Sequence, residues 1–183
     1  MKQAIPLQKA ERWANQVADA LRPYCHRLEI AGSIRRRKPF CGDIDIVVEP
    51  ADLEQLRARI IDGKEVVQNG NQNIHVRLAN DLEIQVFMAR PASRDMFEEI
   101  PSNWGSLLLL RTGSKEHNIF LAQTARANML EWKVYEGLFK DGKLIASDSE
   151  EAIFKALYLD YVPPQKREIA GNSLAAHIRL PST

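Results

Sequence analysis

The stretch "AGSIRRRKPFCGDIDIVV" (residues 31–48) combines a glycine turn, a basic run and two carboxylates. Its last residues alternate between acidic and apolar side chains and predict a strand. Side chains two apart on a strand point the same way, so Asp43 and Asp45 share one face. Two carboxylates on one face repel each other, and Mg²⁺, which prefers carboxylates together with substrate phosphates, is the usual cation between them. A solvated strand face carrying two acids is the other interpretation of so short a motif.

The turn at Gly32-Ser33 adds a second feature to this stretch. It follows an alternating segment at 26–30 and opens a short helix, which presents backbone N–H groups and a hydroxyl to an anion. Arg35 and Arg36 follow on that helix, and a guanidinium group can bind a phosphate through two parallel hydrogen bonds. An anion site close in sequence to a Mg²⁺ site is the combination that a nucleoside triphosphate requires.

A later segment supplies candidates for a third acid. Two-metal phosphoryl transfer needs one for the metal ion that activates the attacking oxygen. The segment "DLEIQVF" (81–87) alternates, with apolar side chains expected toward the core. Asp81 and Glu83 then lie on the face of the two aspartates if the strands are neighbours. The residues alone permit either acid as the ligand.

The remaining pattern indicates an α+β protein of two units. Apolar spacing of three and four residues predicts helices at 7–21, 52–61, 104–111, 115–127 and 149–158. Strands are expected at 26–30, at 43–48, two or three times between 65 and 88, and as a hairpin within 131–147. Turn signals stand at 69–71, 80–81 and 141–142, and breaker residues at 90–95 indicate a linker. We therefore expect units at 1–89 and 90–168, and a tail at 169–183 without a clear period.

Composition narrows the class of protein. The 183 residues carry a net charge of +1 and are 45% hydrophobic, which fits one ordinary domain or two small ones. No apolar run reaches the ~18 residues of a membrane helix, and the N-terminal residues lack the apolar core of a signal peptide. Cys25 and Cys41 have no metal-ligand spacing and indicate a reducing compartment. We expect a cytoplasmic protein with no membrane partner; the oligomeric state is not indicated.

Three motifs in order resemble the family-X DNA polymerases, the group that includes DNA polymerase beta. The first, G-S-x-R-R…G-D-x-D, is present as Gly32, Ser33, Arg35, Arg36, Gly42, Asp43 and Asp45. The second is "RTGSKEHN" (111–118), and the third is "EEAIFKALYLDYVPPQKRE" (150–168). The first motif alone is shared by the wider nucleotidyltransferase superfamily, whereas all three in this order are much more specific. The resemblance covers roughly residues 5–168.

The resemblance implies a nucleotidyltransferase palm with a mixed sheet and helices (1–89), followed by a small α+β thumb (90–168). It implies that Asp43 and Asp45 bind two Mg²⁺ ions, which Mn²⁺ can replace, and that Glu83 completes the catalytic one. Nucleotide-binding roles are implied for Gly32, Ser33, Arg36 and Gly42 at the triphosphate, and for Thr112, Gly113, Ser114 and Asn118 at the sugar and base. We expect a minimal form without the lyase and finger domains that precede the palm in larger members.

Four positions depart from the family pattern. The third acid is normally aspartate, and here it is Glu83; the arginine usual two residues before it is Asp81. The aromatic pair before T-G-S, which screens the sugar, is replaced by Leu110-Arg111. An arginine that many members carry four residues after the thumb asparagine is Ala122.

These observations favour a metal-dependent enzyme that adds nucleotides to a DNA 3′ end. Its partners would be nucleoside triphosphates and a DNA primer/template or gapped DNA, and the resemblance implies a gap-filling, repair type of enzyme. The residues do not separate gap filling from template-independent addition. Two alternatives are a small nucleotidyltransferase that modifies protein or RNA, which rarely carries T-G-S…N, and a catalytically silent module that binds nucleotides or DNA ends. Primer extension with Mg²⁺ or Mn²⁺ distinguishes the enzyme from the silent module.

Overall fold

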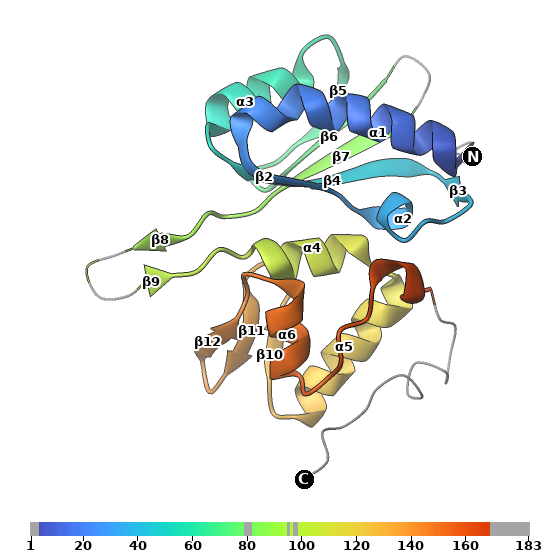
Figure 1. Ribbon diagram of the computed structural model, residues 1–183. Coiled ribbons are helices and arrows are strands. Elements are labelled where there is room, and N and C mark those ends of the chain that lie inside the picture. The colour runs from blue at the N-terminus through green and yellow to red at the C-terminus, as the bar shows by residue number, and fades with distance from the viewer. Residues whose placement is uncertain (1–3, 79–81, 95, 97–98, 169–183) are drawn as a thin grey trace. The chain divides into compact units, whose positions relative to one another are not determined.

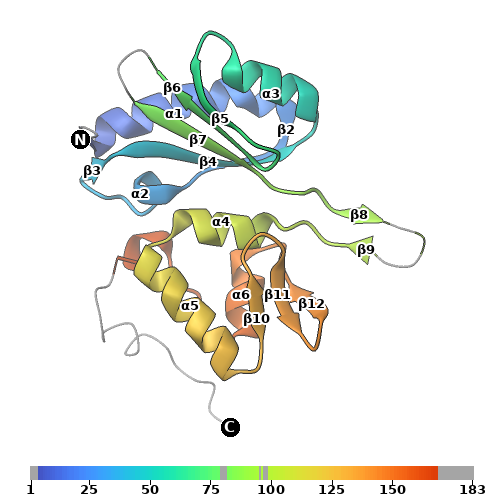
Figure 2. The same cartoon turned by 180° about the vertical axis from the view of Figure 1, so that it is seen from behind.

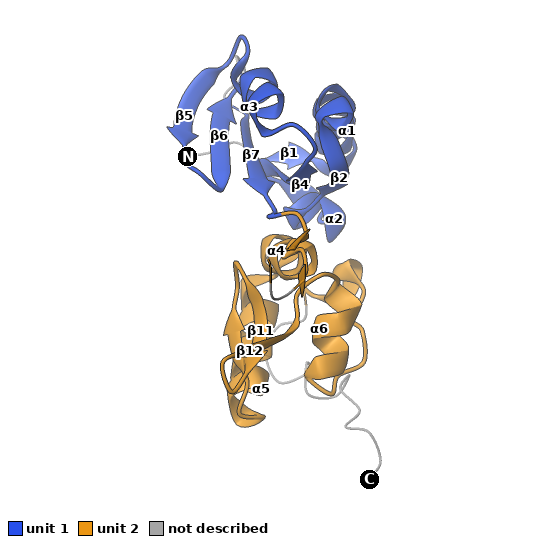
Figure 3. Cartoon of the chain, turned by 90° about the vertical axis from the view of Figure 1, so that its left-hand side faces the viewer, with its two compact units in different colours: residues 1–90 blue, residues 91–183 orange. Residues whose placement is uncertain are grey.

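A computed structural model of the chain describes residues 4–78, 82–94, 96 and 99–168. The chain forms two compact units, Met1–Arg90 and Pro91–Thr183, which Figure 3 colours separately. Each unit contains both helices and strands and has its own hydrophobic core. The α+β class predicted from the sequence is confirmed.

A five-stranded mixed sheet forms the first unit, in the order β2-β4-β7-β6-β5. Its strands are β2 (Cys25–Ile30), β4 (Asp43–Pro50), β5 (Glu65–Asn69), β6 (Asn73–Arg77) and β7 (Glu83–Met88). The β4–β7 pair is parallel, and the β2–β4, β6–β7 and β5–β6 pairs are antiparallel. Helices α1 (Leu7–Leu21) and α3 (Leu53–Ile61) lie over one face of this sheet (Figures 1 and 2).

Period-two alternation determines which face of the sheet is buried under the helices. Ile44 and Ile46 of β4 and Ile84 and Val86 of β7 are buried in one cluster with apolar residues of α1 and α3. Along α1, the buried residues include Ala10, Ala14 and Ala18, four residues apart. Their small side chains let the helix backbone come close to the strands. The opposite face of β4 and β7 carries the polar pairs Asp43–Glu83 and Asp45–Gln85, followed by the buried apolar pair Val47–Phe87.

Short elements complete the first unit around the residue 31–48 stretch. They are β1 (Ile5–Pro6), η1 (Arg22–Tyr24), α2 (Gly32–Arg35) and β3 (Phe40–Cys41). β1 pairs with β3, and the amide of Leu7 donates to the Pro39 carbonyl over 3.0 Å. This contact fastens the loop after α2 to the start of α1. Two residues are too few to show a strand period, so the sequence did not predict this pair.

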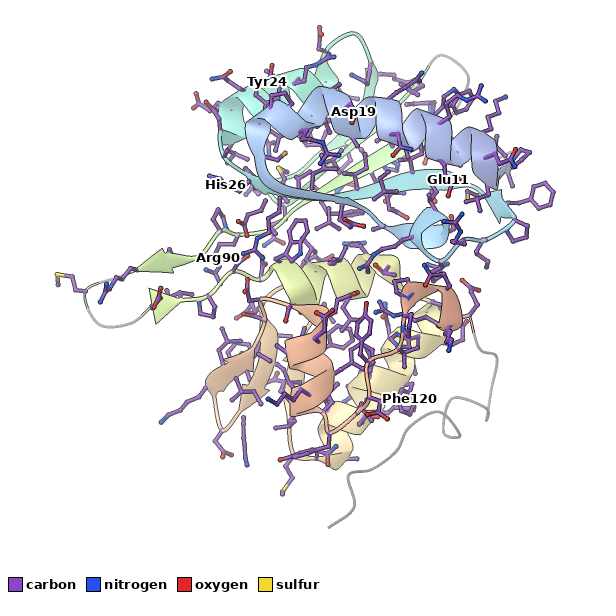
Figure 4. All side chains as sticks on the ribbon, in the orientation of Figure 1. Glu11, Asp19, Tyr24, His26, Arg90 and Phe120 are labelled. Carbon is purple, nitrogen blue, oxygen red and sulfur yellow. The ribbon has the colours of Figure 1, made fainter. Side chains whose placement is uncertain are left out.

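The second unit packs three helices and a small antiparallel sheet around a second core. Its elements are β8 (Ser93–Arg94), β9 (Glu99–Ile100), α4 (Trp104–Thr112), α5 (Lys115–Ala127), β10 (Glu131–Lys133), β11 (Gly137–Lys140), β12 (Lys143–Ala146), α6 (Glu150–Ala156) and η2 (Pro164–Lys166). Leu109, Leu121, Leu138 and Phe154 are among the buried residues of this core. Phe120, labelled on α5 in Figure 4, is partly buried and packs against it.

Most predicted elements are confirmed, and three need correction. The expected linker at 90–95 contains β8, which pairs with β9 as a small hairpin. The segment 131–147 forms three strands, β10-β11-β12, instead of one hairpin, and the last helix ends at Ala156. The turn predicted at 80–81 and the tail at 169–183 lie outside the described residues. Within the described ranges, no helix has the length and apolar character needed to cross a bilayer.

A buried ion pair joins the C-terminal motif to the second core. Arg167, 0% exposed, donates from Nη1 and Nη2 to the Glu150 carboxylate over 2.7 and 3.2 Å. Its Nε donates to the Val162 carbonyl over 2.8 Å, and the Tyr161 hydroxyl donates to Glu150 over 3.1 Å. The carbonyl of Arg167 also accepts a 2.8 Å hydrogen bond from Ser114 Oγ. Breaking such a pair leaves an uncompensated buried charge.

We predict that Arg167→Met lowers the free energy of unfolding of the second unit by about 3–5 kcal/mol, because Glu150 loses its buried cation. The measurement is urea denaturation in a Trp13→Phe background, in which tryptophan fluorescence comes only from the second unit. Lys166→Met, at the exposed neighbouring position, serves as the matched control and should change the value little. Equal midpoints for the two variants would contradict the prediction.

Candidate active site

Three acids are brought together by the parallel pairing of β4 with β7. Asp43 is the direct cross-strand partner of Glu83, and Asp45 is the partner of Gln85. Gln85 Nε2 donates to Asp43 Oδ2 over 3.4 Å. Asp43 and Asp45 are partly exposed, whereas Glu83 is only 9% exposed. The expected sharing of one face by Asp43, Asp45 and Glu83 depended on the two strands being neighbours, and this register meets that condition.

The glycine turn lies directly against Asp45. Gly32 has φ +59°, and a Cβ added there would lie 2.0 Å from Asp45 Oδ2. The amide of Ala31 donates to the backbone carbonyl of Asp45 over 2.8 Å. Only glycine combines this backbone conformation with so close an approach of a carboxylate. The turn and the acid therefore form one structural unit.

Glu83 lies between Asp43 on one side and two residues of β6 on the other. Arg77 Nη2 is 3.5 Å from Glu83 Oε1, and His75 Nε2 is 3.0 Å from Glu83 Oε2. Among the described residues, His75 Nε2 has no hydrogen bond of proper geometry, so this is a close contact only. Arg77 Nη1 also donates to Glu65 of β5 over 2.9 Å. The sequence analysis identified neither His75 nor Arg77.

The residues expected at the triphosphate surround the same turn. Ser33 Oγ is shielded from solvent and makes no hydrogen bond of proper geometry to another described residue. Burial raises the pKa of the nearby Cys41 thiol, an effect that the Ser33 hydroxyl partly opposes, so Cys41 is a packed thiol. A Cβ at Gly42 would meet no atom within 4 Å, which leaves open space at that position. A hydroxyl on a glycine turn, with open space at Gly42, suits an incoming anion.

The basic run is partly paired with acids of its own unit. Arg35 Nε lies 3.8 Å from Glu29, and Arg37 Nη2 lies 3.7 Å from Glu11, which Figure 4 labels on α1. The amide of Arg36 donates to the Gly32 carbonyl over 3.2 Å, which attaches Arg36 to the turn. The location of Arg36 beside the turn is consistent with its expected role, while Arg35 and Arg37 are directed at carboxylates.

The donor set is appropriate for Mg²⁺. Carboxylate oxygens are hard ligands, and the sheet places three of them at adjacent positions on one face. With the side chains as they stand, no group of three or more His, Cys, Asp or Glu within the described ranges is arranged to hold a metal ion. Glu83 in particular contacts Arg77 and His75 on the β6 side. The register thus supplies suitable ligands at neighbouring positions of one face.

The thumb candidates form a second group at the α4–α5 junction. Thr112 is buried at the end of α4, and Gly113 follows with φ +71°. Ser114 Oγ accepts from the His117 amide over 3.3 Å as the cap of α5 and donates to Arg167. Asn118 Nδ2 donates to the Leu110 carbonyl over 2.8 Å. The hydrogen bonds of Ser114 and Asn118 hold the junction together, a structural role that the motif did not reveal.

Arg111, at the position of the family's aromatic pair, is stacked on a tyrosine. Its guanidinium carbon lies 5.5 Å from the centre of the Tyr135 ring, and its Nη2 donates to the Tyr135 hydroxyl over 2.5 Å. The long side chain is thereby held against an aromatic surface. The sequence offered no sign of this partner, because Tyr135 lies after β10, outside the three motifs.

Comparisons with known proteins agree with this arrangement. The sequence matches the DNA polymerase beta palm over residues 4–101 and the DNA polymerase beta thumb over residues 107–168. No curated protein matches it significantly. Leishmania infantum polymerase beta has a similar fold in a ternary P/T complex, at 19% identity over 91% of this chain and 77% of that chain, with a TM-score of 0.72. Its ternary gap complex is 18% identical over 91% of this chain and 71% of that chain, with a TM-score of 0.70.

The two family matches follow each other in the order of the two units, and together they span most of the chain. The resemblance inferred from the three motifs is therefore confirmed: the chain belongs to the family-X DNA polymerases of the DNA polymerase beta type, whose palm and thumb it contains.

Proposed function

We propose that this DNA polymerase extends a DNA 3′ end with two Mg²⁺ ions held by Asp43, Asp45 and Glu83. The observation that carries the proposal is the register of β4 against β7, which puts Asp43 beside Glu83 while Gly32 is in contact with Asp45. Bound Mg²⁺ would supply charge stabilisation at the transferring phosphoryl group and lower the pKa of the attacking hydroxyl. Mn²⁺, which also accepts oxygen ligands, is proposed as a substitute.

The residues of the turn would bind the nucleotide. Backbone N–H groups near Gly32 and the Ser33 hydroxyl would donate to the triphosphate, and Arg36 would pair with a phosphate oxygen. The open space at Gly42 would let the backbone approach the phosphates. Because Gly32 lies against Asp45, phosphate and metal ligands would be oriented together. Thr112, Gly113 and Asn118 are proposed to border the sugar and base.

The proposed DNA substrate is a primer/template or a gapped duplex. The Leishmania infantum polymerase beta structures that share the fold are a ternary P/T complex and a ternary gap complex. We therefore propose gap filling of a repair type for this chain as well. A comparison of extension rates on a one-nucleotide gap, an open primer/template and a single strand would test the substrate preference.

We predict that Asp43→Asn and Asp45→Asn each lower the rate of primer extension by about a hundredfold or more, because each removes a charged metal ligand. Both substitutions preserve side-chain shape, so the fold should survive. In EDTA, Asp45→Asn should melt no lower than the wild type, since it relieves repulsion between the acids.

Asp19→Asn is the matched control, because Asp19 is an exposed acid on α1 of the same unit (Figure 4). It should leave the rate within about twofold, as expected for an exposed pair. Extension by either active-site variant within a few-fold of the wild type would refute the two-metal proposal. A wild-type protein that extends no primer with Mg²⁺ or Mn²⁺ would refute polymerase activity altogether.

Two glycines with similar positive φ allow the effect of a close contact to be distinguished from the effect of backbone strain. We predict that Gly32→Ala abolishes extension, because the new Cβ would displace the Asp45 carboxylate 2.0 Å away. Gly63→Ala has a similar φ of +64° but would meet no atom within 4 Å. Both variants should lose about 1 kcal/mol or more of stability, and only the first should lose activity at temperatures where both are folded. Loss of activity in both would show that strain alone accounts for the effect.

The sugar site should discriminate weakly against ribonucleotides. Leu110 is smaller than the aromatic residue usual there, and Arg111 is turned onto Tyr135. A site that merely tolerates an added hydroxyl rejects it only about a hundredfold. We predict kcat/KM values for matched ribo- and deoxynucleotides within about that factor on one primer.

The double variant Leu110→Tyr with Arg111→Phe should raise this discrimination by restoring bulk. Tyr135→Phe, which removes only the hydroxyl that accepts from Arg111, is the control for loss of that hydrogen bond. A deoxynucleotide preference of about a thousandfold or more in the natural sequence would mean that other groups exclude the 2′-hydroxyl.

A further inference from the structure

A row of charged side chains crosses four strands on the polar face of the first sheet. Glu65 of β5 is the cross-strand partner of Arg77 on β6, Arg77 is the partner of Glu83 on β7, and Glu83 is the partner of Asp43 on β4. Directly paired residues on adjacent strands lie within reach of one another. The charges therefore alternate in sign from Glu65 through Arg77 to Glu83. The row then ends at Asp43, a second acid of the proposed metal site.

Arg77 is the cation next to the least exposed acid of this row. Its Nη2 lies 3.5 Å from Glu83 Oε1, and Glu83 is only 9% exposed. A buried carboxylate is unfavourable unless a cation or several hydrogen bonds compensate it. His75 contacts the other oxygen, Oε2, at 3.0 Å. Each oxygen of Glu83 thus has one neighbour on the β6 side.

A second contact fixes the position of Arg77 itself. Arg77 Nη1 donates to Glu65 over 2.9 Å, so the two ends of the guanidinium fork are directed at carboxylates on opposite sides. Because the planar Arg77 guanidinium already has two partners, little of its conformational freedom remains to be lost when a ligand binds at Glu83. Glutamate is longer than aspartate by one methylene and has one more rotatable bond, which makes such a restraint more valuable at position 83.

We propose that Arg77 is a positioning residue that restrains the Glu83 carboxylate, from the neighbouring strand β6, beside the two aspartates where the catalytic metal ion would bind. This inference rests on the proposed function, since it assigns Glu83 as a metal ligand. Arg77 touches neither substrate nor metal in this scheme. Its effect should therefore appear in how much metal the enzyme requires, with little change in nucleotide binding.

The test compares Arg77→Met with Arg59→Met in the full chain. Arg59 is the matched control, because it is also a partly exposed arginine paired with an acid, Asp62, over 3.3 Å. It lies on helix α3 and does not belong to the row of charged residues on the sheet. Primer extension is measured across a Mg²⁺ series, and Mn²⁺ binding is measured independently by electron paramagnetic resonance. Melting temperatures in EDTA show whether each variant is folded.

We expect Arg77→Met to raise the Mg²⁺ concentration at half-maximal rate at least fivefold, to weaken Mn²⁺ binding correspondingly, and to change KM for the nucleotide less than twofold. Arg77→Lys, which keeps the charge but loses the planar fork, should recover part of the loss. Arg59→Met should match the wild type. Glu65→Gln should have a smaller effect than Arg77→Met, because Glu65 acts only through Arg77.

Three results would overturn the inference while leaving the polymerase activity intact. Unchanged metal requirement and Mn²⁺ binding in Arg77→Met would show that Arg77 only stabilises the sheet. Tighter metal binding with an undiminished rate would show that Arg77 competes with the metal for Glu83. An equal effect of Arg59→Met would indicate a general loss of positive charge. An inactive wild type would instead refute the proposed function.

Discussion

The parallel pairing of β4 with β7 is the constraint on which the palm depends. It aligns Asp43 with Glu83 and Asp45 with Gln85, two segments that are distant in the sequence. The intervening Ile44 and Ile84 are buried on the other face under α1 and α3, so the register cannot slip by one residue without exposing that core. The burial that stabilises the sheet therefore also determines which carboxylates are neighbours.

The approach of Gly32 to Asp45 couples a second group of residues to that register. The turn lies close enough to the carboxylate that any side chain at position 32 would occupy the same space. β4 presents its acids at the start of the strand, and the turn follows β2, the antiparallel neighbour of β4. A phosphate held by the turn and a cation held by the acids would hence be adjacent by construction, which is the geometry that phosphoryl transfer requires.

Local patterns in the sequence predicted the elements but not the contacts between distant ones. Alternation placed Glu83 on the acid face, and spacing located the helices of both units within a few residues. His75 and Arg77 were missed, although "NIHVR" alternates as cleanly as the acid strands. Their importance depends on β6 lying beside β7, and nothing in the sequence states which strands are neighbours. The partner of Arg111 was missed for the same reason, since Tyr135 is distant in the sequence.

Acidic side chains outnumber basic ones on the acid-bearing face of the first sheet. The row that crosses the sheet contains Glu65, Glu83 and Asp43 with Arg77 as its only basic member, and Asp45 adds a fourth carboxylate on the same face. Arg77 is shared between Glu65 and Glu83. The two aspartates of β4 have Gln85 as the polar neighbour across the strand, and an amide carries no charge. Acids therefore outnumber bases along this row, and the divalent ions of the proposed mechanism would offset that excess of negative charge.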